Sequence, residues 1–449
     1  MTAAVRRPFT SLAVPNYRRY FAGLVVSLSG NWMQTVAEIW LVLRLTGSGV
    51  ALGLTAALQF APILLAGAYG GLLADRLPKR RLLLFTQAAM AVPALALWAL
   101  TVTGSVQLWM VYALVLVRGA VNAVDNPARQ SFVVELVGPE RVVNAVSLNS
   151  VVVHTARIVG PALAGVLIAT VGVGPCFGLN ALSFGATIVA LLRMDPAALH
   201  TAATGAAKRT PGQIRSALRY VRATPELAIP LAAMAVVGTL AFNFQVLLPL
   251  LARFTFHGTA ATYATFTAAM GVGSVVAALV TGARGRTGGA LVAGSALAFG
   301  LALLAAAAAP SMALEVAVLV LLGGASVSFA AGVNSSLQLA VEPAMRGRVM
   351  ALYSVVFLGS TPIGGPLAGW LAGAAGPRWG FAAGGVAALA AGMATWWAFT
   401  RNASDRSSGD STPHTVVNST LSSAPRSPRR PHRRGRPGAR AGAATGTRG

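Results

Sequence analysis

Long apolar segments separated by short polar connections recur along most of the chain. Most of them hold about 20 residues, the length that an α-helix needs to cross the hydrocarbon core of a bilayer. Lipid offers no partner to an unpaired backbone group, so each segment is predicted to be helical. The twelve predicted spans are residues 20–44, 51–74, 82–103, 107–128, 143–169, 174–194, 227–252, 261–283, 288–309, 312–335, 348–374 and 379–400. The pattern predicts an all-α membrane protein with twelve transmembrane helices.

Lysine and arginine are distributed unevenly over the connections between these spans. If the N-terminus lies inside, four outward connections contain neither residue: those near 46–50, 104–106, 170–173 and 310–311. Arg253 and Arg378 are the exceptions, and the inward connections and both termini carry most of the other bases. Because basic loops stay in the cytoplasm, this alternation predicts a multi-pass protein with both termini cytoplasmic. The first residues contain no recognisable cleavage site, so no cleaved signal peptide is expected.

The composition fits a membrane protein. Hydrophobic residues make up 55% of the 449 residues and charged residues only 10%, with a mean hydropathy of +0.67, whereas a soluble domain carries about 25% charged residues. The net charge of +24 lies in short connections and in the C-terminal region rather than on one amphipathic face, so no nucleic-acid partner is expected. The single cysteine, Cys176, excludes an internal disulfide and a cysteine-based zinc cluster. No metal or cofactor site is predicted.

A charged hairpin, GGLLADRLPKRR over residues 70–81, joins the second and third spans. We expect Asp75, its only acid, to face the positive N-terminal end of the eleventh span near Arg348, with the glycines letting the second and eleventh spans approach closely. The residues of this predicted conformational latch are Gly71, Asp75, Arg76, Lys79 and Arg80. The alternative is that these charges only set the topology. The pattern G-x-x-x-D-R-x-x-K-R-R resembles the loop between helices 2 and 3 of the major facilitator superfamily, which implies a secondary transporter.

The two halves of the chain repeat one another. The segment RVVNAVSLNSVVVHTARIVGPALAGVL from Arg141 resembles RVMALYSVVFLGSTPIGGPLAGWL from Arg348, at an offset of about 205 residues. Two six-helix pseudo-repeats in parallel are the arrangement of the major facilitator fold. The predicted domains are an N-terminal six-helix half over 1–194, a cytoplasmic linker over 195–226, a C-terminal six-helix half over 227–400 and a disordered basic cytoplasmic tail over 401–449. A short amphipathic helix is expected in the linker, near 212–222.

A few charged side chains lie inside predicted spans, where each costs about 2.5–3.5 kcal/mol and is a functional candidate. Glu38, Arg118 and Arg157 lie in the first, fourth and fifth spans. A buried carboxylate among arginines exchanges a proton as its solvation changes, so this group is predicted to couple protons to transport, with Glu38 working against either arginine. The alternative is a structural ion-pair cluster. Asp125 is expected to join a cytoplasmic network with Arg129 and the hairpin.

The second half lacks these charges, since the repeat offset places Asn243 opposite Glu38 and Gly323 opposite Arg118. Amides and aromatic rings remain there, and they suit a bulky, partly apolar ligand. The residues predicted to bind the substrate are Asn31, Gln34, Asn243, Gln245, Phe266, Gln338 and Phe357. Core packing is the alternative for any single phenylalanine. Glu315, near the outer end of the tenth span, is interpreted as reaching water.

The fifth span contains RIVGPALAG over residues 157–165. Pro161 removes a backbone donor and bends the helix, while Gly160 and Gly165 permit close packing. The segment resembles the G-x-x-x-G-P-x-x-G motif of facilitator antiporters and keeps only part of its glycine run. The resemblance implies export, and a packing kink is the alternative.

Four segments, PNYRRYFAGLVVSLSGNWMQTVAEIWLVLRLTGS, LGLTAALQFAPILLAGAYGGLLADRLPKRR, NPARQSFVVELVGPERVVNAVSLNS and RIVGPALAG, together resemble one branch of the superfamily. It is the branch of bacterial drug and siderophore exporters that includes the enterobactin exporter. The resemblance covers nearly all of residues 9–400. It implies a proton-driven exporter in the bacterial inner membrane that moves a drug, an antibiotic or a siderophore by alternating access.

Other function classes are disfavoured by what the chain lacks. No G-x-x-x-x-G-K-[ST] occurs, which excludes an ATP-driven pump in this chain, and no signature of an enzyme is present. The expected partners are a small-molecule substrate, protons and the lipid bilayer, and the protein is expected to be monomeric. An importer of a small metabolite and a non-transporting membrane sensor remain the alternative functions.

Overall fold

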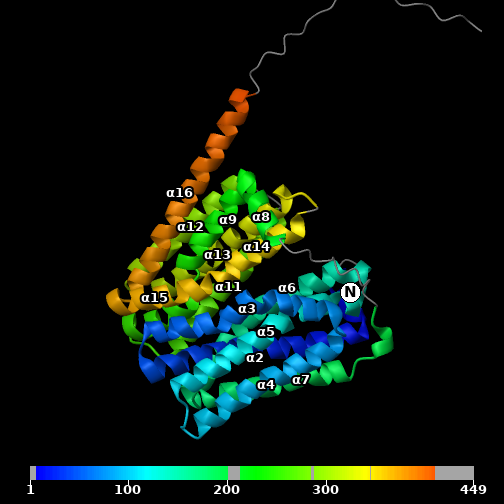
Figure 1. The fold of residues 1–449 in the computed structure, drawn as a ribbon. Helices are drawn as coiled ribbons and strands as arrows, with labels where there is room; N and C mark the ends of the chain where they lie inside the picture. The colour runs from blue at the N-terminus through cyan, green and yellow to red at the C-terminus, as the bar shows by residue number, and fades with distance from the viewer. Residues whose placement is uncertain (1–6, 201–212, 285–287, 344, 410–449) are drawn as a thin grey trace, which may run out of the picture. The chain divides into compact units, whose positions relative to one another are not determined.

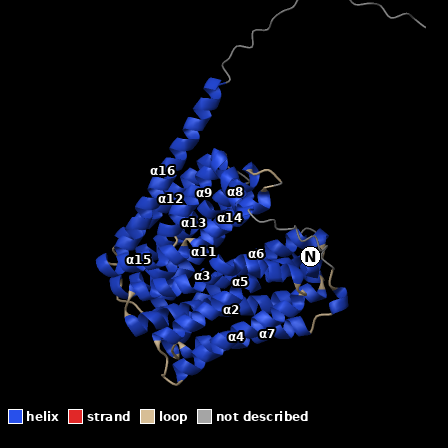
Figure 2. Ribbon diagram, in the orientation of Figure 1, coloured by secondary structure: helices blue, strands red, loops and turns tan. Residues whose placement is uncertain are grey.

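The regular elements of the described chain are all helices, as the apolar pattern predicts. The computed structural model describes residues 7–200, 213–284, 288–343 and 345–409 (Figure 1), and Figure 2 shows no strand among them. The first bundle consists of α2 (Pro15–Thr46), α3 (Gly49–Arg76), α4 (Lys79–Val102), α5 (Leu108–Val137), α6 (Val142–Thr170) and α7 (Gly174–Leu192). Short helices η1 (Arg7–Ala13), η2 (Pro139–Arg141) and η3 (Pro196–Ala198) flank them.

The second bundle follows the linker helix α8 (Gln213–Ala223). Its members are α9 (Pro225–Leu240), α10 (Phe244–Leu250), the π-helical η4 (Leu251–Thr255), α11 (Ala260–Arg284), α12 (Gly289–Ala308), α13 (Met312–Ala340), α14 (Arg346–Gly359), α15 (Thr361–Ala375) and α16 (Pro377–Gly409). Two predicted spans are each divided, one into α9, α10 and η4 and the other into α14 and α15.

Eleven helical segments of the described chain are long and apolar enough to cross a membrane. The two divided spans are among them, as Pro225–Thr255 and Arg346–Ala375. The remaining predicted span, α2, has 32 residues and is absent from the eleven. Asn31, Gln34 and Glu38 in its middle lower its mean hydropathy. The least apolar of the predicted spans is therefore the one that carries the candidate coupling carboxylate.

Each bundle packs mainly within itself. In the first bundle α3 lies against α5, α4 against α5 and α7, and α2 against α6 and α7 (blue through cyan to teal-green in Figure 1). In the second bundle α11 and α12 both lie against α13. Two pairs of helices make most of the contact between the bundles, α3 with α15 and α6 with α11, and α10 and α14 add smaller contacts with the first bundle. Both bundles lie in the compact unit that ends at Ala403.

Glycines set the distance between α3 and α15. A Cβ atom added at Gly53 would lie 2.4 Å from the carbonyl oxygen of Gly365, and one added at Gly49 would lie 2.4 Å from that of Gly369. No side chain fits in these places, so the two backbones touch directly. This corrects the expected place of the approach between the second and eleventh spans. The close approach lies at the start of α3, at the end opposite the hairpin. In the hairpin itself, Gly70 packs on Ala123 of α5.

The two divided spans break where side chains and proline compete with the helix backbone. Between α9 and α10, Asn243 Nδ2 donates to the carbonyl oxygen of Thr239 at 2.8 Å and takes the place of a backbone donor. Between α14 and α15, Ser360 Oγ donates to Phe357 O at 2.7 Å. Pro362 follows in the first turn of α15, where its missing N–H costs nothing. Neither break follows from apolar periodicity, which predicts both spans as continuous.

The chain outside the bundles agrees in part with the predicted boundaries. The expected amphipathic linker helix is present as α8, although residues 201–212 lie outside the described part. At the C-terminus α16 continues to Gly409, past the expected end of the last span at 400. Residues 410–449, most of the predicted disordered tail, also lie outside the described part.

Candidate functional site

Glu38 on α2 is buried inside the first bundle, with 2% of the residue exposed. Arg118 on α5 is buried beside it, and Arg118 Nη2 lies 2.5 Å from Glu38 Oε2. Water therefore solvates neither charge. Removing one partner of such a pair leaves an uncompensated buried charge, which is far more costly than losing an exposed ion pair. The two side chains thus depend on each other.

A chain of amides extends from this pair to α7. Gln34 Nε2 donates to Glu38 Oε1 at 2.6 Å, and Asn180 Nδ2 donates to Gln34 Oε1 at 2.5 Å. Ser183 Oγ in turn donates to Asn180 Oδ1 at 2.8 Å. Both oxygens of Glu38 thus receive a donor, one from α5 and one from its own helix. The arrangement fixes the orientation of the carboxylate.

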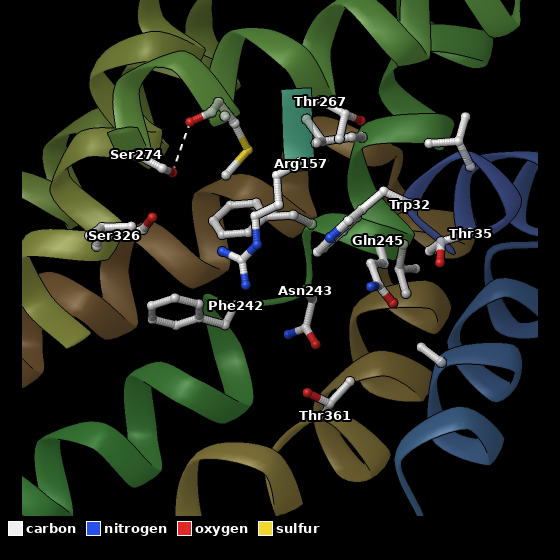
Figure 3. A pocket seen from close by; sticks show the side chains of 18 of the residues that line it. Trp32, Thr35, Arg157, Phe242, Asn243, Gln245, Thr267, Ser274, Ser326 and Thr361 are labelled. Carbon is white, nitrogen blue, oxygen red and sulfur yellow. Dashed lines mark hydrogen bonds between the residues drawn. The ribbon is translucent and has the colours of Figure 1, made fainter. Parts of the chain in front are cut away.

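Arg157 lies apart from the pair of Glu38 and Arg118. The sequence left open which arginine works against Glu38, and the structure pairs Arg118 with it. The guanidinium of Arg157, on α6, lies over the ring of Trp32, with its carbon 5.1 Å from the ring centroid. Its Nε is buried and has no hydrogen-bond partner in the described structure. Figure 3 shows this side chain reaching into a cavity.

The cavity has a volume of about 270 Å³ and lies between the two bundles (Figure 3). Eight elements or their junctions line it. The first bundle contributes Trp32, Thr35 and Val36 of α2, Ala56 and Phe60 of α3, and Arg157 of α6. The second bundle contributes Phe242 to Val246 and Leu248 from α10 and the break before it, Tyr263, Thr267, Met270, Gly271 and Ser274 of α11, Ser326, Val327 and Ala330 of α13, Phe357 of α14, and Thr361 of α15. The wall is mostly apolar, with a few convergent polar groups, as is typical of small-molecule sites.

Three of the residues predicted to bind the substrate line this cavity, namely Asn243, Gln245 and Phe357. The other four do not. Gln34 belongs to the amide chain of Glu38, and Phe266 is buried against Phe256, with ring centroids 5.6 Å apart.

Gln338 is exposed and donates to Asn334 at 2.5 Å. Asn31 also lies outside the lining. Sequence reasoning missed the wall that α11 contributes. The spacing of Tyr263, Thr267, Met270 and Ser274 could have indicated this wall, because it places the four residues on one helix face.

Three phenylalanines of the second bundle, Phe242, Phe244 and Phe357, form part of the cavity wall, and two more pack behind them. The ring of Phe242 lies 5.0 Å from that of Phe299, 5.7 Å from Phe357 and 6.0 Å from Phe244, measured between centroids. Phe299 and Phe329 are stacked at 6.5 Å. This aromatic cluster, made up of Phe242, Phe244, Phe299, Phe329 and Phe357, is held by ring contacts at the centroid distances that aromatic pairs prefer.

The bases of the 70–81 hairpin bind within the first bundle. Lys79 Nζ lies 2.6 Å from Glu135 Oε1 on α5. Arg80 donates from Nε to the carbonyl oxygen of Leu191 at 2.8 Å, at the end of α7. Asp75 is exposed and has no ion pair or hydrogen bond among the described residues. Gly71 is half-buried and Arg76 exposed.

The expected partner of Asp75 is engaged elsewhere in this conformation. Arg348 Nη1 donates to Ser216 Oγ of α8 at 3.5 Å, the outer limit of a hydrogen bond. The predicted latch between Asp75 and the start of α14 is therefore not formed here, and it stays a prediction for another conformation.

Asp125 pairs with Arg129 as expected, but no residue of the 70–81 hairpin bonds to it in the described structure. Its carboxylate is fully buried and lies 3.1 Å from Arg129 Nη2. Thr86 Oγ1 and Gln87 Nε2, both on α4, donate to Asp125 Oδ1 at 2.7 and 2.9 Å. This network fastens α4 to α5 and lies outside the cavity lining.

The RIVGPALAG segment faces two neighbours at once. A Cβ atom added at Gly160 would lie 2.5 Å from Trp32 Cβ, so this glycine sets the distance between α6 and α2. One added at Gly165 would lie 2.7 Å from Ala264 Cβ on α11, in the opposite bundle. Pro161 is buried within α6. The segment thus connects the helix of Glu38 with the interface between the bundles.

Glu315 does not reach water, so that interpretation is wrong. The residue is fully buried in the first turn of α13. Neither carboxylate oxygen has a hydrogen-bond partner in the described structure. Among the described residues there is also no group of three or more His, Cys, Asp or Glu side chains that could hold a metal ion.

Comparisons with known proteins agree with this architecture. Residues 6–426 match the protein family described as "Transmembrane secretion effector". The staphyloferrin A transporter of Staphylococcus aureus is 27% identical over 269 residues, which cover 58% of this chain and 65% of that protein. The enterobactin exporter EntS of Citrobacter koseri is 26% identical over 367 residues, 80% of this chain and 85% of that protein. The chain therefore spans just under two thirds of the first relative and most of the second.

Solved structures share the fold at low sequence identity. The nucleoside transporter NupG superposes with a TM-score of 0.66 at 14% identity, covering 86% of this chain and 99% of that one. A bacterial homologue of the human lysosomal transporter Spinster, in an inward-facing and unoccupied conformation, gives 0.64 at 15% identity, covering 86% and 95%. At these identities the likeness concerns the fold alone.

Proposed function

Because this chain belongs to the transmembrane secretion effectors of the major facilitator superfamily, we propose that it is a secondary transporter that exports a small, partly apolar organic molecule in exchange for protons. The observation that carries the proposal is a cavity between two helical bundles, whose wall includes one face of the helix that holds a buried ion pair.

Family membership confirms several expectations drawn from the sequence. The resemblance to the bacterial exporter branch is confirmed by the match over residues 6–426 and by the siderophore-transporter relatives. The all-helical fold class is confirmed by the structure and its neighbours. The assignment to transporters rather than enzymes is confirmed by the same relatives. Proton coupling, the direction of transport and the substrate belong to our proposal.

Glu38 is the proposed proton site. In its ionised form the carboxylate accepts from Arg118 and Gln34. A proton on Glu38 removes its charge and leaves Arg118 without a counter-charge, so protonation weakens the contact between α2 and α5. Trp32, Thr35 and Val36 on the same helix line the cavity. A change at Glu38 is thereby transmitted through α2 to the ligand.

Alternating access is proposed to occur at the two helix pairs that join the bundles. At the predicted outer end α3 and α15 touch through Gly49, Gly53, Gly365 and Gly369. Opening that end requires these backbones to separate, while Asp75 and the start of α14 come together at the other end. The predicted latch would then stabilise the outward-open state, which explains why Asp75 is unpaired in the present one.

Transport in proteoliposomes tests this function directly. The purified full-length protein is reconstituted, and uptake of radiolabelled staphyloferrin A or enterobactin is measured under an imposed pH gradient. A proton antiporter accumulates substrate when the lumen is acidic, because protons leave as substrate enters. Accumulation only with an acidic bath would indicate a proton-coupled importer instead. If neither gradient drives accumulation of either compound, while a reconstituted enterobactin exporter accumulates its own substrate, the proposed function is wrong for these substrates.

The orientation is proposed from the distribution of bases, with both termini in the cytoplasm. Single cysteines at Gly104 and Pro310, in a Cys176→Ser background, should react with an impermeant maleimide in intact cells. Cysteines at Thr210 and Asp410 should react only after permeabilisation. Cys176, which is buried, is the single cysteine of the sequence, so its replacement removes the only competing thiol. Labelling of position 210 or 410 from outside would contradict the orientation.

A further inference from the structure

We propose that the cavity binds an organic anion and that Arg157 binds its carboxylate. This inference rests on the proposed function only in that the ligand of the cavity is taken to be the transported molecule. It assigns a chemical class to that molecule and a role to Arg157 that is separate from the ion pair of Glu38.

The first observation is a charge that the protein does not neutralise. Arg157 is the only charged residue among the described residues that line the cavity. It takes part in no ion pair or hydrogen bond in the described structure, and its one specific contact is the face of Trp32. A cation held within a membrane span is costly without a counter-charge. An anionic ligand would supply that counter-charge, and a guanidinium binds a carboxylate through two parallel hydrogen bonds.

The second observation is that Arg157 is not needed by Glu38. Both oxygens of that carboxylate already receive donors, from Arg118 and Gln34. The neighbouring titratable group on α6 is His154, whose Nδ1 is buried and unpartnered, and it brings no negative charge. The facing elements α2 and α11 contribute no acid to the lining. The positive potential of the cavity is therefore left for a ligand.

The third observation concerns two acceptor atoms. Asn243 Oδ1 and Gln245 Oε1 are buried without a hydrogen-bond partner. The orientation of the Asn243 amide is fixed, because its Nδ2 donates to Thr239 O. Figure 3 shows both amides in the cavity that Arg157 and Trp32 also line. A ligand that pairs with these oxygens carries a hydroxyl or N–H donor beside its carboxylate, while Phe242 and Phe357 receive its apolar part.

Matched acids and amides test this inference. The probes are 4-hydroxyphenylacetate with 4-hydroxyphenylacetamide, and indole-3-acetate with indole-3-acetamide, titrated into the purified full-length protein in detergent by calorimetry. Each amide keeps the shape of its acid and removes the charge. We expect each acid to bind at least about tenfold more tightly than its amide, as a charge-assisted pair implies.

Variants assign the preference to Arg157. Arg157→Gln should remove the preference for acids, and Arg157→Lys should keep part of it. Arg253→Gln is the matched control, because it removes one positive charge from an exposed position outside the cavity and should leave the preference intact. Thermal unfolding of each variant shows whether it is folded.

Three results would overturn the inference: equal binding of acids and amides, an unchanged preference in folded Arg157→Gln, or no binding of either acid. These titrations use no ion gradient, so they are independent of the transport assay. Acid preference without transport would refute the proposed function alone, and transport without acid preference would refute only this inference.

Discussion

The two bundles each bury a glutamate inside a helix, and they surround it in opposite ways. Glu38 in the first bundle receives Arg118 on one oxygen and Gln34 on the other. Glu315 in the second bundle has no hydrogen-bond partner on either oxygen within the described structure. Burial is nearly complete in both, at 2% and 0% exposure. Burial alone therefore does not identify a functional carboxylate, and its hydrogen-bond and ion-pair partners distinguish the two sites.

The same contrast extends to the rest of each core. The ion pairs found among the described residues, Glu38–Arg118, Asp125–Arg129 and Lys79–Glu135, all lie in the first bundle. The second bundle faces the cavity with three rings of its aromatic cluster, Phe242, Phe244 and Phe357. Hydrogen-bonded charges fix the orientation of polar groups, whereas aromatic rings offer a ligand large apolar contact area. The two repeats thus share their helix packing but not their charged side chains. This difference agrees with the proposed division into proton coupling in one bundle and substrate adaptation in the other.

Arg118→Gln should have the largest effect on stability. The substitution leaves Glu38 buried without its counter-charge, and breaking a buried pair costs about 3–5 kcal/mol. Unfolding in detergent, followed by tryptophan fluorescence, measures the loss. The double variant Glu38→Gln with Arg118→Gln should recover much of it, because no charge then remains. Equal stability of Arg118→Gln and the wild type would show that the pair is not structural.

Phe299→Leu should have an intermediate effect. Phe299 contacts Phe242, Phe244 and Phe329, and each aromatic pair contributes about 0.5–1.5 kcal/mol, so a loss of about 2 kcal/mol is expected. Phe381→Leu is the matched control, since Phe381 is equally buried and no ring contact is found for it among the described residues. If both variants lose the same stability, the aromatic cluster is ordinary packing.

Glu315→Gln should stabilise the protein by about 1 kcal/mol. Glu38→Gln should instead destabilise it, because Arg118 then stays buried without its counter-charge. A carboxylate without hydrogen bonds bears a desolvation cost, and the neutral amide of similar shape reduces it. Denaturation of the two variants side by side measures the difference. Destabilisation by Glu315→Gln would mean that this carboxylate is paired in solution, and the contrast between the glutamates would disappear.

Asp75→Asn should have the smallest effect on stability, within about 0.5 kcal/mol, because Asp75 is exposed and unpaired here. We expect turnover to fall by about fivefold, since a charge at a helix N-terminus is worth about 1 kcal/mol in the outward-open state. Arg81→Gln, at another exposed hairpin position, controls for a general change of charge. Unchanged turnover in Asp75→Asn would indicate that the hairpin only sets topology.

The fold was largely predictable from the sequence because lipid leaves the chain few choices. Apolar length located the spans, and the amphipathic pattern located α8. The breaks before Phe244 and after Gly359 were not predictable, because they depend on the side chains of Asn243 and Ser360 competing for backbone groups. Periodicity is insensitive to such local competition.

The candidate site was predictable only in part. Rare charges drew attention to Glu38, Arg118 and Arg157, yet the choice of partner depends on how α2, α5 and α6 rotate about their axes. Glycines determine that rotation through contacts such as Gly160 on Trp32, and these become visible only in three dimensions. Gln338 and Phe266 satisfied the expected chemistry but do not line the cavity, because residue type alone does not specify which neighbour a helical side chain contacts.

Transport by Glu38→Gln under two driving forces tests the central claim most directly. The variant and the wild type are reconstituted, and labelled staphyloferrin A or enterobactin, whichever the wild type accumulates, is followed first with an acidic lumen and then in substrate-for-substrate exchange without a gradient. Glu38→Gln should fail to accumulate substrate against its gradient and should still exchange it, because exchange needs no net movement of protons. Exchange also shows that the variant is folded. Continued accumulation by Glu38→Gln would contradict the account, since the coupling group would then lie elsewhere.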